Sequence, residues 1–413
     1  MPSPSSNAVL LPRLARPTPT RILFVVLDGL GGAVGREPTA LERSHHPHLD
    51  ALARRSALGR YVPVADGITP GSGPGHLALF GHDPLEVEVG RGLLETLGVG
   101  VDVAAGDVCA RGNFGTLDSR GLLADRRAGR IPTEQSRPLA DMLRERIGRI
   151  EDVQVEVNPG LQYRFSVVLR GAGLGDRVAD TDPQVTGVAP LAAQAADAAS
   201  EKTARVANRF VALARELLGG RSQANGVMLR GFSGRPPLAT LRSMAALTGC
   251  AVAAYPAYRG VARLLGMDLA PGVGPSSSIA DEVTALEQAW RSTQPAYDFF
   301  FLHDKGTDSA GEDGDEARKG QVIEAFDAEV PRLLALEPDV IVLTGDHSTP
   351  GPMAGHSWHP VPFLLHGPWC EPDGLPRFDE PSCRRGALGN SVPGTSLLRL
   401  ALANAGKLAK FGA

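Results

Sequence analysis

Three apolar runs, each followed at once by acidic and other polar residues, constrain most strongly what this chain of 413 residues can fold into. They lie within residues 21–27, 297–302 and 340–343. A run without regular polar positions is typical of a strand buried on both faces, as in a parallel sheet. We therefore predict an α/β fold with a mainly parallel sheet, in which helices at residues 278–290 and 315–336 alternate with the strands.

The middle of the chain departs from this pattern. All ten histidines lie in two windows, residues 45–82 and 303–366, and the long segment between them has none. Within that segment, residues 153–170 alternate apolar and polar side chains as half-exposed strands do, and residues 189–218 are rich in alanine and predict a helix. The organisation that we predict is a flexible tail at 1–20, a core made of 21–104 and 271–413, and an inserted α+β domain at 105–270.

Composition and charge exclude several classes of partner. A net charge of −4, with 3 Trp, 5 Tyr and 13 Phe, offers neither a broadly basic surface nor an aromatic platform for nucleic acid. No apolar run approaches the roughly 18 residues of a membrane span, and residues 1–21 lack the apolar stretch of a signal peptide. The four cysteines are scattered, so we expect reduced thiols and a cytoplasmic location. The oligomeric state stays open.

Aspartate and histidine residues gather in the polar turns that follow the three predicted strands. Asp28 follows the first strand, Asp308 the second, and Asp346 with His347 the third, and His356 comes nine residues after His347. A single aspartate there is usually a turn or capping residue, but the carboxyl ends of parallel strands share one sheet edge. Mixed carboxylate and imidazole donors suit Mn or Zn better than Ca, and their number favours two ions.

Residues 69–76, Thr-Pro-Gly-Ser-Gly-Pro-Gly-His, place one serine between glycines. The glycines leave room for a tetrahedral group to approach the hydroxyl of Ser72, although a flexible surface turn explains the same residues equally well. A serine hydroxyl is a weak nucleophile at neutral pH unless a base or a metal ion stabilises its alkoxide. The predicted metal site would meet that need, so Ser72 is a candidate nucleophile.

Longer motifs occur in order from one end of the chain to the other. They are Val-Leu-Asp-Gly at 26–29, Pro-Gly-Ser-x-x-Gly-His at 70–76, Gly-His-Asp-Pro at 81–84, Gly-Arg-Gly at 90–92, Arg-Gly-Asn-Phe at 111–114, Asp-Arg-Arg-Ala-Gly-Arg at 125–130, Ala-Tyr-Pro-Ala-Tyr-Arg-Gly-Val-Ala-Arg at 254–263, Asp-x-Ala-Gly-x-Asp-Gly-Asp at 308–315 and Thr-Gly-Asp-His-Ser-Thr-Pro at 344–350. With them, nearly the whole chain from about residue 20 resembles the archaeal type of cofactor-independent phosphoglycerate mutase. That family is a branch of the alkaline phosphatase superfamily.

The resemblance implies an alkaline-phosphatase-like core with an inserted substrate-binding lid, and an activity. The activity is the interconversion of 3-phosphoglycerate and 2-phosphoglycerate without 2,3-bisphosphoglycerate. It would pass through a phosphoserine at Ser72, with His76 as an assisting hydrogen-bonding group. We expect two divalent ions, Mn first, with Zn, Co or Mg as alternatives. The resemblance assigns one ion to Asp28, Ser72, Asp346 and His347, and the other to Asp308, Glu312 and His356.

Basic side chains are the natural partners of a phosphorylated, carboxylate-bearing substrate, because a guanidinium binds two oxygens at once. Four arginines fall in strings of the inserted segment that resemble the family, and one lysine lies in the turn before Asp308. The candidates for substrate binding are therefore Arg126, Arg130, Arg230, Arg259 and Lys305. Each of the arginines could equally be a solvated surface charge.

Three positions depart from the family pattern. Glu312 and Gln184 stand where we expect histidines, and Gly73-Pro74 stands where relatives carry an acidic or polar residue. A carboxylate at position 312 can still bind Mn or Zn, and four residues after Asp308 on a helical turn the two side chains share one face. An exposed glutamate near the helix end is the other interpretation.

These departures keep other functions open. One alternative is a phosphatase or phosphotransferase of the same superfamily that acts on another phosphorylated or phosphonate small molecule, because a fold does not fix a substrate. Another is a relative that keeps the fold only for binding. Six of the seven metal positions match the family, which favours an enzyme.

Overall fold

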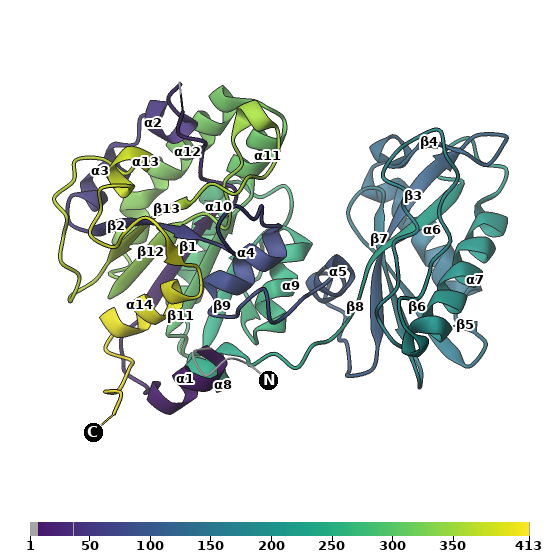
Figure 1. The fold of residues 1–413 in the computed structure, drawn as a ribbon, viewed down its shortest axis with the longest axis horizontal. Coiled ribbons are helices and arrows are strands. Elements are labelled where there is room, and N and C mark those ends of the chain that lie inside the picture. Colours follow the sequence, from purple (N-terminus) through teal and green to yellow (C-terminus); the bar gives the residue numbers. More distant parts are fainter. Residues whose placement is uncertain (1–6, 36, 413) are drawn as a thin grey trace. The chain divides into compact units, whose positions relative to one another are not determined.

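The structure is a computed structural model, and it describes residues 7–35 and 37–412. The chain divides into two compact units. The first unit runs to residue 88 and resumes at residue 238, and the second comprises residues 89–237. Each unit has its own sheet (Figure 1). The predicted α/β class with a mainly parallel sheet is confirmed by the first of them.

The first unit is built on an eight-stranded sheet with the order β10-β9-β11-β1-β12-β13-β2-β14. The five strands from β10 to β12 are parallel, β13 is antiparallel to both of its neighbours, and β14 is parallel to β2. Every residue of β1 is buried, as its apolar run predicts for a central strand. The bounds are β1 Ile22–Leu27, β2 Ala57–Val62, β9 Gly249–Ala253, β10 Asp268–Leu269, β11 Phe299–Asp304, β12 Val340–Thr344, β13 Val361–His366 and β14 Val392–Pro393.

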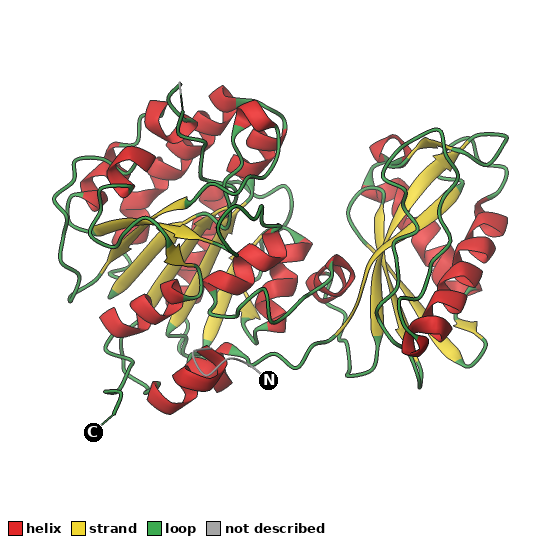
Figure 2. Ribbon diagram, viewed as in Figure 1, coloured by secondary structure: helices red, strands yellow, loops and turns green. Residues whose placement is uncertain are grey.

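Helices pack on both faces of this sheet (Figure 2). Alternate residues of β1 point to opposite faces, so Leu23 packs in a cluster with residues of α2, α3, α10 and α12, whereas Phe24 contacts Phe80 at the end of α4. None of the described helices combines the length and the apolarity needed to cross a membrane. The bounds are α1 Asn7–Leu14, α2 Ala40–Arg43, α3 Pro47–Ala53, α4 Ser72–Leu79, α8 Leu241–Ala245, α9 Pro256–Leu264, α10 Ile279–Trp290, α11 Gly306–Glu312, α12 Glu316–Leu334, α13 Glu380–Cys383 and α14 Ser396–Asn404.

The two helices predicted in this unit are confirmed, and their starts have a clear cause. The side chain of Ser278 accepts the backbone N–H of Asp281 at the start of α10. The side chain of Asp315 accepts the backbone N–H of Arg318 at the start of α12. Such N-cap bonds satisfy backbone donors that a helix leaves unpaired.

The predicted flexible tail is wrong for residues 7–14, which form α1, while residues 1–6 lie outside the described residues. Leu11 is 1 % exposed. The buried amide of Asn7 donates to the carbonyl oxygens of Gly81 at 2.9 Å and Thr395 at 2.6 Å. Composition suggested a loose segment, but the burial of Leu11 and two distant hydrogen bonds of Asn7 fix it to the core.

The second unit holds an antiparallel sheet with the order β4-β3-β7-β6-β5, and β8 also pairs with β3. Helices α6 and α7 pack against it in a separate core that includes Leu139, Leu143 and Phe210. The strands predicted within 153–170 are confirmed. The bounds are α5 Arg91–Gly98, β3 Val108–Leu117, β4 Leu123–Asp125, α6 Thr133–Arg146, β5 Arg149–Ile150, β6 Val153–Pro159, β7 Arg164–Arg170, α7 Glu201–Leu218 and β8 Gly226–Gly234.

Two predictions for the middle of the chain need correction. The helix predicted at 189–218 starts only at Glu201, because residues 189–197 are not helical and Ala195 forms an antiparallel bridge to Val178. The second unit begins at 89 rather than 105 and ends at 237 rather than 270. The reason is pairing: α5 packs on β3 and β8, and β9 joins the large sheet beside β11.

Candidate active site

The structure brings the three predicted aspartates together at the carboxyl edge of the large sheet. Asp28 follows β1, Asp308 lies in α11 just after β11, and Asp346 follows β12. These strands are neighbours in the order β11-β1-β12, and all three carboxylates are 0 % exposed. Three buried carboxylates at one edge need cations or hydrogen-bond donors around them.

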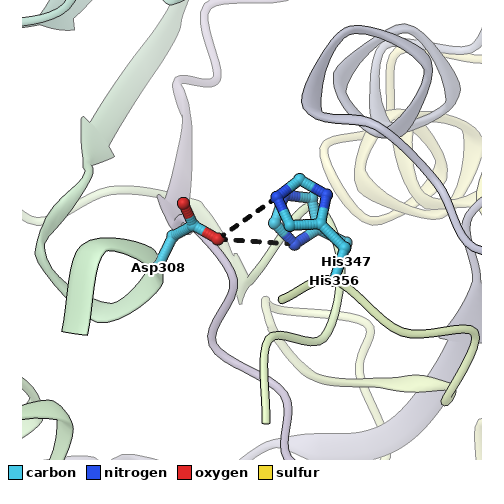
Figure 3. A group of neighbouring side chains, drawn as sticks. All are labelled: Asp308, His347 and His356. Carbon is cyan, nitrogen blue, oxygen red and sulfur yellow. Dashed lines mark ion pairs between the residues drawn. The ribbon is translucent and has the colours of Figure 1, made fainter. Parts of the chain in front are cut away.

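Two clusters with the geometry of metal sites share His347. In the first cluster, His347 Nε2 lies 3.4 Å from Asp28 Oδ1 and 3.2 Å from Asp346 Oδ2. In the second, His347 Nδ1 lies 3.9 Å and His356 Nε2 lies 3.5 Å from Asp308 Oδ1, as the dashed lines of Figure 3 mark. The rings of His347 and His356 are stacked, with centroids 3.6 Å apart.

The buried oxygen atoms of the first cluster fit a cation. Both carboxylate oxygens of Asp28 and Oδ2 of Asp346 have no hydrogen-bond partner among the described residues. Burial alone would raise the pKa of Asp28, but Lys305 and the nearby histidines outweigh it and hold this pKa well below its usual value. Lys305 Nζ at 3.2 Å and His303 Nε2 at 3.3 Å from Asp28 Oδ2 offset this charge in part, and a divalent ion would stabilise it further.

A hydroxyl relay selects the tautomer of His347. Thr349 Oγ1 donates its hydrogen to Asp308 Oδ1 at 2.7 Å and lies 3.0 Å from His347 Nδ1. Because the hydroxyl has one hydrogen, it can only accept from His347, so Nδ1 carries the proton. Burial lowers the pKa of His347, which favours a neutral ring with a lone pair on Nε2. That lone pair faces Asp28 and Asp346.

Ser72 is the first residue of α4, and its hydroxyl faces the first cluster. Ser72 Oγ lies 3.3 Å from His347 Nε2. A Cβ atom on Gly75 would lie 2.5 Å from the carbonyl oxygen of Asp346, so only glycine lets α4 approach the turn after β12 this closely. The motif glycines were expected to clear space around the hydroxyl, and for Gly75 the space is taken by the backbone of Asp346.

His76 supports the groups beside it rather than the serine hydroxyl. Its Nδ1 lies 2.8 Å from the carbonyl oxygen of Ser72 and 3.2 Å from Asp346 Oδ2, and both of these atoms are acceptors. Burial alone would lower the pKa of His76, but Asp346 raises it above the ordinary value. A ring that donates from Nδ1 therefore fixes the start of α4 against the Asp346 carboxylate.

Two further predicted site residues, Glu312 and Lys305, lie beside the second cluster. Glu312 ends α11 four residues after Asp308, and its Oε1 is 3.7 Å from His356 Nε2, with the side chain 54 % exposed. The ammonium group of Lys305 contacts the carboxylate of Asp308 and lies 3.2 Å from Asp28 Oδ2. Lys305 was predicted as a phosphate contact, and the structure places its charge between the two clusters.

Two buried aromatic neighbours of Asp28 were not among the predicted site residues. His303 Nε2 lies 3.3 Å from Asp28 Oδ2, and the ring of Tyr258 stacks on His303 with centroids 3.7 Å apart. Both residues stand close to or inside motif strings, but a histidine within a strand and a tyrosine within a helix look like core residues. Only the pairing of β1 with β11 shows that His303 reaches the carboxylate.

The predicted arginines do not form one group. Arg126 binds both oxygens of Asp182 at 2.8 Å, and Arg230 lies 3.4 Å from Asp182 Oδ2, so these two meet in the second unit. Arg130 is exposed in the same unit. Arg259 was expected in the inserted segment, but it belongs to α9 of the first unit, where it donates to the carbonyl oxygen of Val273.

Two further arginines of the second unit were not predicted. Arg111 of β3 lies opposite Arg230 of β8, and Arg164 of β7 lies opposite Asn113, so the three arginines share one face of the sheet. The buried Nε atoms of Arg111 and Arg164 have no hydrogen-bond partner among the described residues. Burial lowers the pKa of Arg111 to about 10, and the neighbouring arginines add to this shift against the opposing effect of Glu95. Such a cluster favours an anion.

Solved structures share this fold over nearly the whole chain. A protein from Pyrococcus horikoshii superimposes with a TM-score of 0.80 and 28% identity, over 95% of this chain and 99% of its own. A cofactor-independent phosphoglycerate mutase from Thermoplasma acidophilum gives a TM-score of 0.68 and 28% identity, over 94% of this chain and 100% of its own. The chain therefore has the α/β fold of a cofactor-independent phosphoglycerate mutase.

Sequence relatives narrow this class to a family. A profile described as 2,3-bisphosphoglycerate-independent phosphoglycerate mutase matches residues 53–223. Relatives described as probable enzymes of that name are 49% identical over 406 residues in Thermus thermophilus, covering 98% of this chain and 99% of the relative, and 44% identical over 413 residues in Aquifex aeolicus, covering 98% and 100%. The chain belongs to the 2,3-bisphosphoglycerate-independent phosphoglycerate mutase family, as its motifs predicted.

Proposed function

We propose that the chain interconverts 3-phosphoglycerate and 2-phosphoglycerate through a phosphoserine at Ser72. The observation that carries this proposal is the 3.3 Å between Ser72 Oγ and His347 Nε2, at a cluster that also holds Asp28 and Asp346. The nucleophile, an unprotonated imidazole nitrogen and two buried carboxylates thus meet at one point. Family membership supports the substrate, and the local geometry supports the residue.

Two divalent cations would occupy the two clusters, with Mn expected because the donors mix carboxylate and imidazole. Asp28, Asp346, His347 Nε2 and Ser72 would hold the first, and Asp308, His356 and Glu312 the second. A bound cation there lowers the pKa of a hydroxyl ligand and offsets charge on a transferring phosphoryl group. The relay from His347 Nδ1 through Thr349 to Asp308 keeps Nε2 free for the first cluster.

The transfer itself needs two matched steps. Ser72 Oγ attacks phosphorus as the bond from phosphorus to the glycerate oxygen breaks, and the hydroxyl proton goes to that oxygen. The glycerate then presents its other hydroxyl, which takes the phosphoryl group back and returns a proton to Ser72. His76 holds the start of α4 during both steps, because it donates toward the Ser72 carbonyl or Asp346.

We infer that the arginine face of the second unit binds the anionic groups of the substrate. Arg111, Arg164 and Arg230 share that face, and Arg126 is fixed beside Arg230 through Asp182. Several guanidinium groups brought together without enough carboxylates repel one another unless an anion lies among them. A phosphate or carboxylate would supply that charge, and the planar fork of arginine suits both.

An enolase-coupled assay separates this proposal from its alternative. Purified protein with Mn²⁺ and 3-phosphoglycerate should yield phosphoenolpyruvate once enolase is present, with little free phosphate. Free phosphate without 2-phosphoglycerate would instead favour a phosphatase, the alternative that the departures at Gln184 and Glu312 keep open. A mutase must exclude water while the phosphoryl group is on the serine, so the ratio of the two products reports the function directly.

A further inference from the structure

Lys319, in α12, is a buried lysine that the function described above does not use. It is 1 % exposed, and its Nζ donates to the backbone carbonyl oxygens of Gly29 at 2.8 Å, Gly31 at 3.0 Å and Thr349 at 2.9 Å. An ammonium group has three hydrogens, and here each finds one acceptor. Burying this charge costs free energy, which the three hydrogen bonds offset.

The three carbonyl groups belong to the two turns that carry most of the first cluster. Gly29 follows Asp28 directly, and Thr349 comes two residues after His347. Gly29 has φ +65°, and a Cβ atom there would collide with Thr349 Oγ1, so the two turns pack in contact. Lys319 therefore joins the turn after β1 to the turn after β12 through their backbones.

Thr349 extends this link to the second cluster. Its hydroxyl contacts both Asp308 and His347, as described above, and its backbone N–H donates to the carbonyl oxygen of Gly31 at 3.0 Å. Movement of the Thr349 backbone would therefore shift a carboxylate of one cluster and the imidazole shared by both. One ammonium group is placed where it can fix all of these positions.

Two glutamates accept hydrogen bonds from backbone N–H groups of the same segments. Glu380 of α13 accepts the backbone N–H of Gly32 at 2.9 Å, and Glu316 of α12 accepts that of Gly351 at 2.5 Å. Glu380 also accepts the hydroxyl of Thr39. These carboxylates offset part of the charge of Lys319 and use the donors of the turns, while Lys319 uses their acceptors. The glutamates thus bind backbone N–H groups of the turns, and Lys319 binds their carbonyl oxygens.

We propose that Lys319 is a positioning residue for both metal clusters: its ammonium group fixes the turns of Asp28 and of His347–Thr349 in the geometry that binds the cations. This inference rests on the proposed metal sites. Groups that orient metal ligands typically change metal affinity by about 10- to 100-fold when they are removed. A lysine that only stabilises the fold would change the melting temperature and leave metal affinity alone.

Lys407 offers a matched control. It is also 1 % exposed in the first unit, and its Nζ donates to the carbonyl oxygen of Thr18 at 3.0 Å and to Asp298 at 2.8 Å. Neither of these acceptors belongs to the two turns. Lys319→Met and Lys407→Met therefore each remove one buried ammonium group, and only the first removes it from the proposed metal-binding turns.

The experiment is a calorimetric titration of Mn²⁺ into chelator-stripped wild type, Lys319→Met and Lys407→Met, with a melting temperature for each. We expect Lys319→Met to bind Mn²⁺ about 10-fold or more weakly, with kcat reduced more than KM changes, while Lys407→Met only melts earlier. Equal Mn²⁺ affinity in wild type and Lys319→Met would overturn the inference. No Mn²⁺ binding by the wild type would instead overturn the proposed metal sites.

A second variant decides the matter if Lys319→Met does not fold. Thr349→Val keeps the shape of the side chain and the carbonyl that Lys319 binds, but removes the hydroxyl that joins the turn to Asp308 and His347. Weakened Mn²⁺ binding in this variant supports the linked geometry. Wild-type Mn²⁺ affinity there would show that the turns do not control the clusters, and the inference would fail.

Discussion

At the scale of a single residue, the two nitrogens of His347 have different partners. Nε2 faces Asp28 and Asp346, whereas Nδ1 is bound to the Thr349 hydroxyl. The sequence predicted His347 as a ligand of the first ion, but nothing in it could assign the tautomer. That assignment depends on Thr349, whose hydroxyl reaches Asp308 only because the turns after β11 and β12 lie side by side.

Glu312 is the departure from the family pattern that can be tested at this scale. If it binds the second ion, Glu312→Ala should lose one Mn²⁺ per chain and nearly all turnover, whereas Glu312→His should keep both ions. The physical reason is that its carboxylate lies 3.7 Å from His356 Nε2, on the same helix as Asp308. Metal analysis and the coupled assay check this. Full metal content and wild-type rates in Glu312→Ala would show that Glu312 is an exposed residue with no part in binding.

At the scale of elements, hydrophobic patterns and capping residues in the sequence predicted the strands and helices that short segments determine by themselves. The buried strands β1, β11 and β12 and the capped helices α10 and α12 stand where periodicity placed them. The arginine face of the second unit could not be found this way, because Arg111, Arg164 and Arg230 meet only through the register of β3 with β7 and β8. Register depends on the whole sheet, and a short pattern does not carry it.

The contact between α10 and β11 gives a prediction about pH and stability. Glu282 is 2 % exposed with one oxygen unpartnered among the described residues, and burial first, then Asp304, raises its pKa from 4.5 to about 9. The folded state thus keeps a proton that the unfolded state releases above its ordinary pKa. The stability that this proton confers is complete below about pH 4.5 and is lost as pH rises toward 9.

Replacing this carboxyl by the neutral amide should therefore flatten the pH dependence. We expect Glu282→Gln to lose less stability than the wild type between about pH 6 and 9, with a difference at the upper end on the order of a few kcal/mol. Thermal melts across this range check the prediction. If the melting temperatures of the two proteins changed in parallel with pH, Glu282 would be ionised in the folded state at neutral pH.

At the scale of the whole molecule, the chain separates two kinds of chemistry. The first unit carries the carboxylates, the histidines and Ser72, and the second carries the arginine face. The histidine-free middle of the sequence indicated this division, but the predicted boundaries at 105 and 270 differ from the observed boundaries at 89 and 237. The strand β9 is short and α9 was taken with the inserted segment, so only strand pairing shows that both belong to the first unit.

Removal of metal should abolish the activity of the enzyme and leave its fold largely intact. Chelation should abolish turnover in the coupled assay, and Mn²⁺ should restore it better than Ca²⁺, because imidazole donors suit borderline ions and calcium prefers oxygen alone. Circular dichroism of the stripped protein serves as the control for folding. Full activity in excess chelator would refute any role for a metal ion.

The proposed function requires Ser72 to carry the phosphoryl group between the two hydroxyls of glycerate. Metal-loaded protein is mixed with 3-phosphoglycerate, quenched in acid and digested, and the peptide that contains Ser72 is examined by mass spectrometry. We predict one added phosphoryl group on Ser72, and neither this label nor measurable turnover in a folded Ser72→Ala variant. Substantial turnover by Ser72→Ala, or a label on another residue alone, would show that Ser72 does not carry the phosphoryl group.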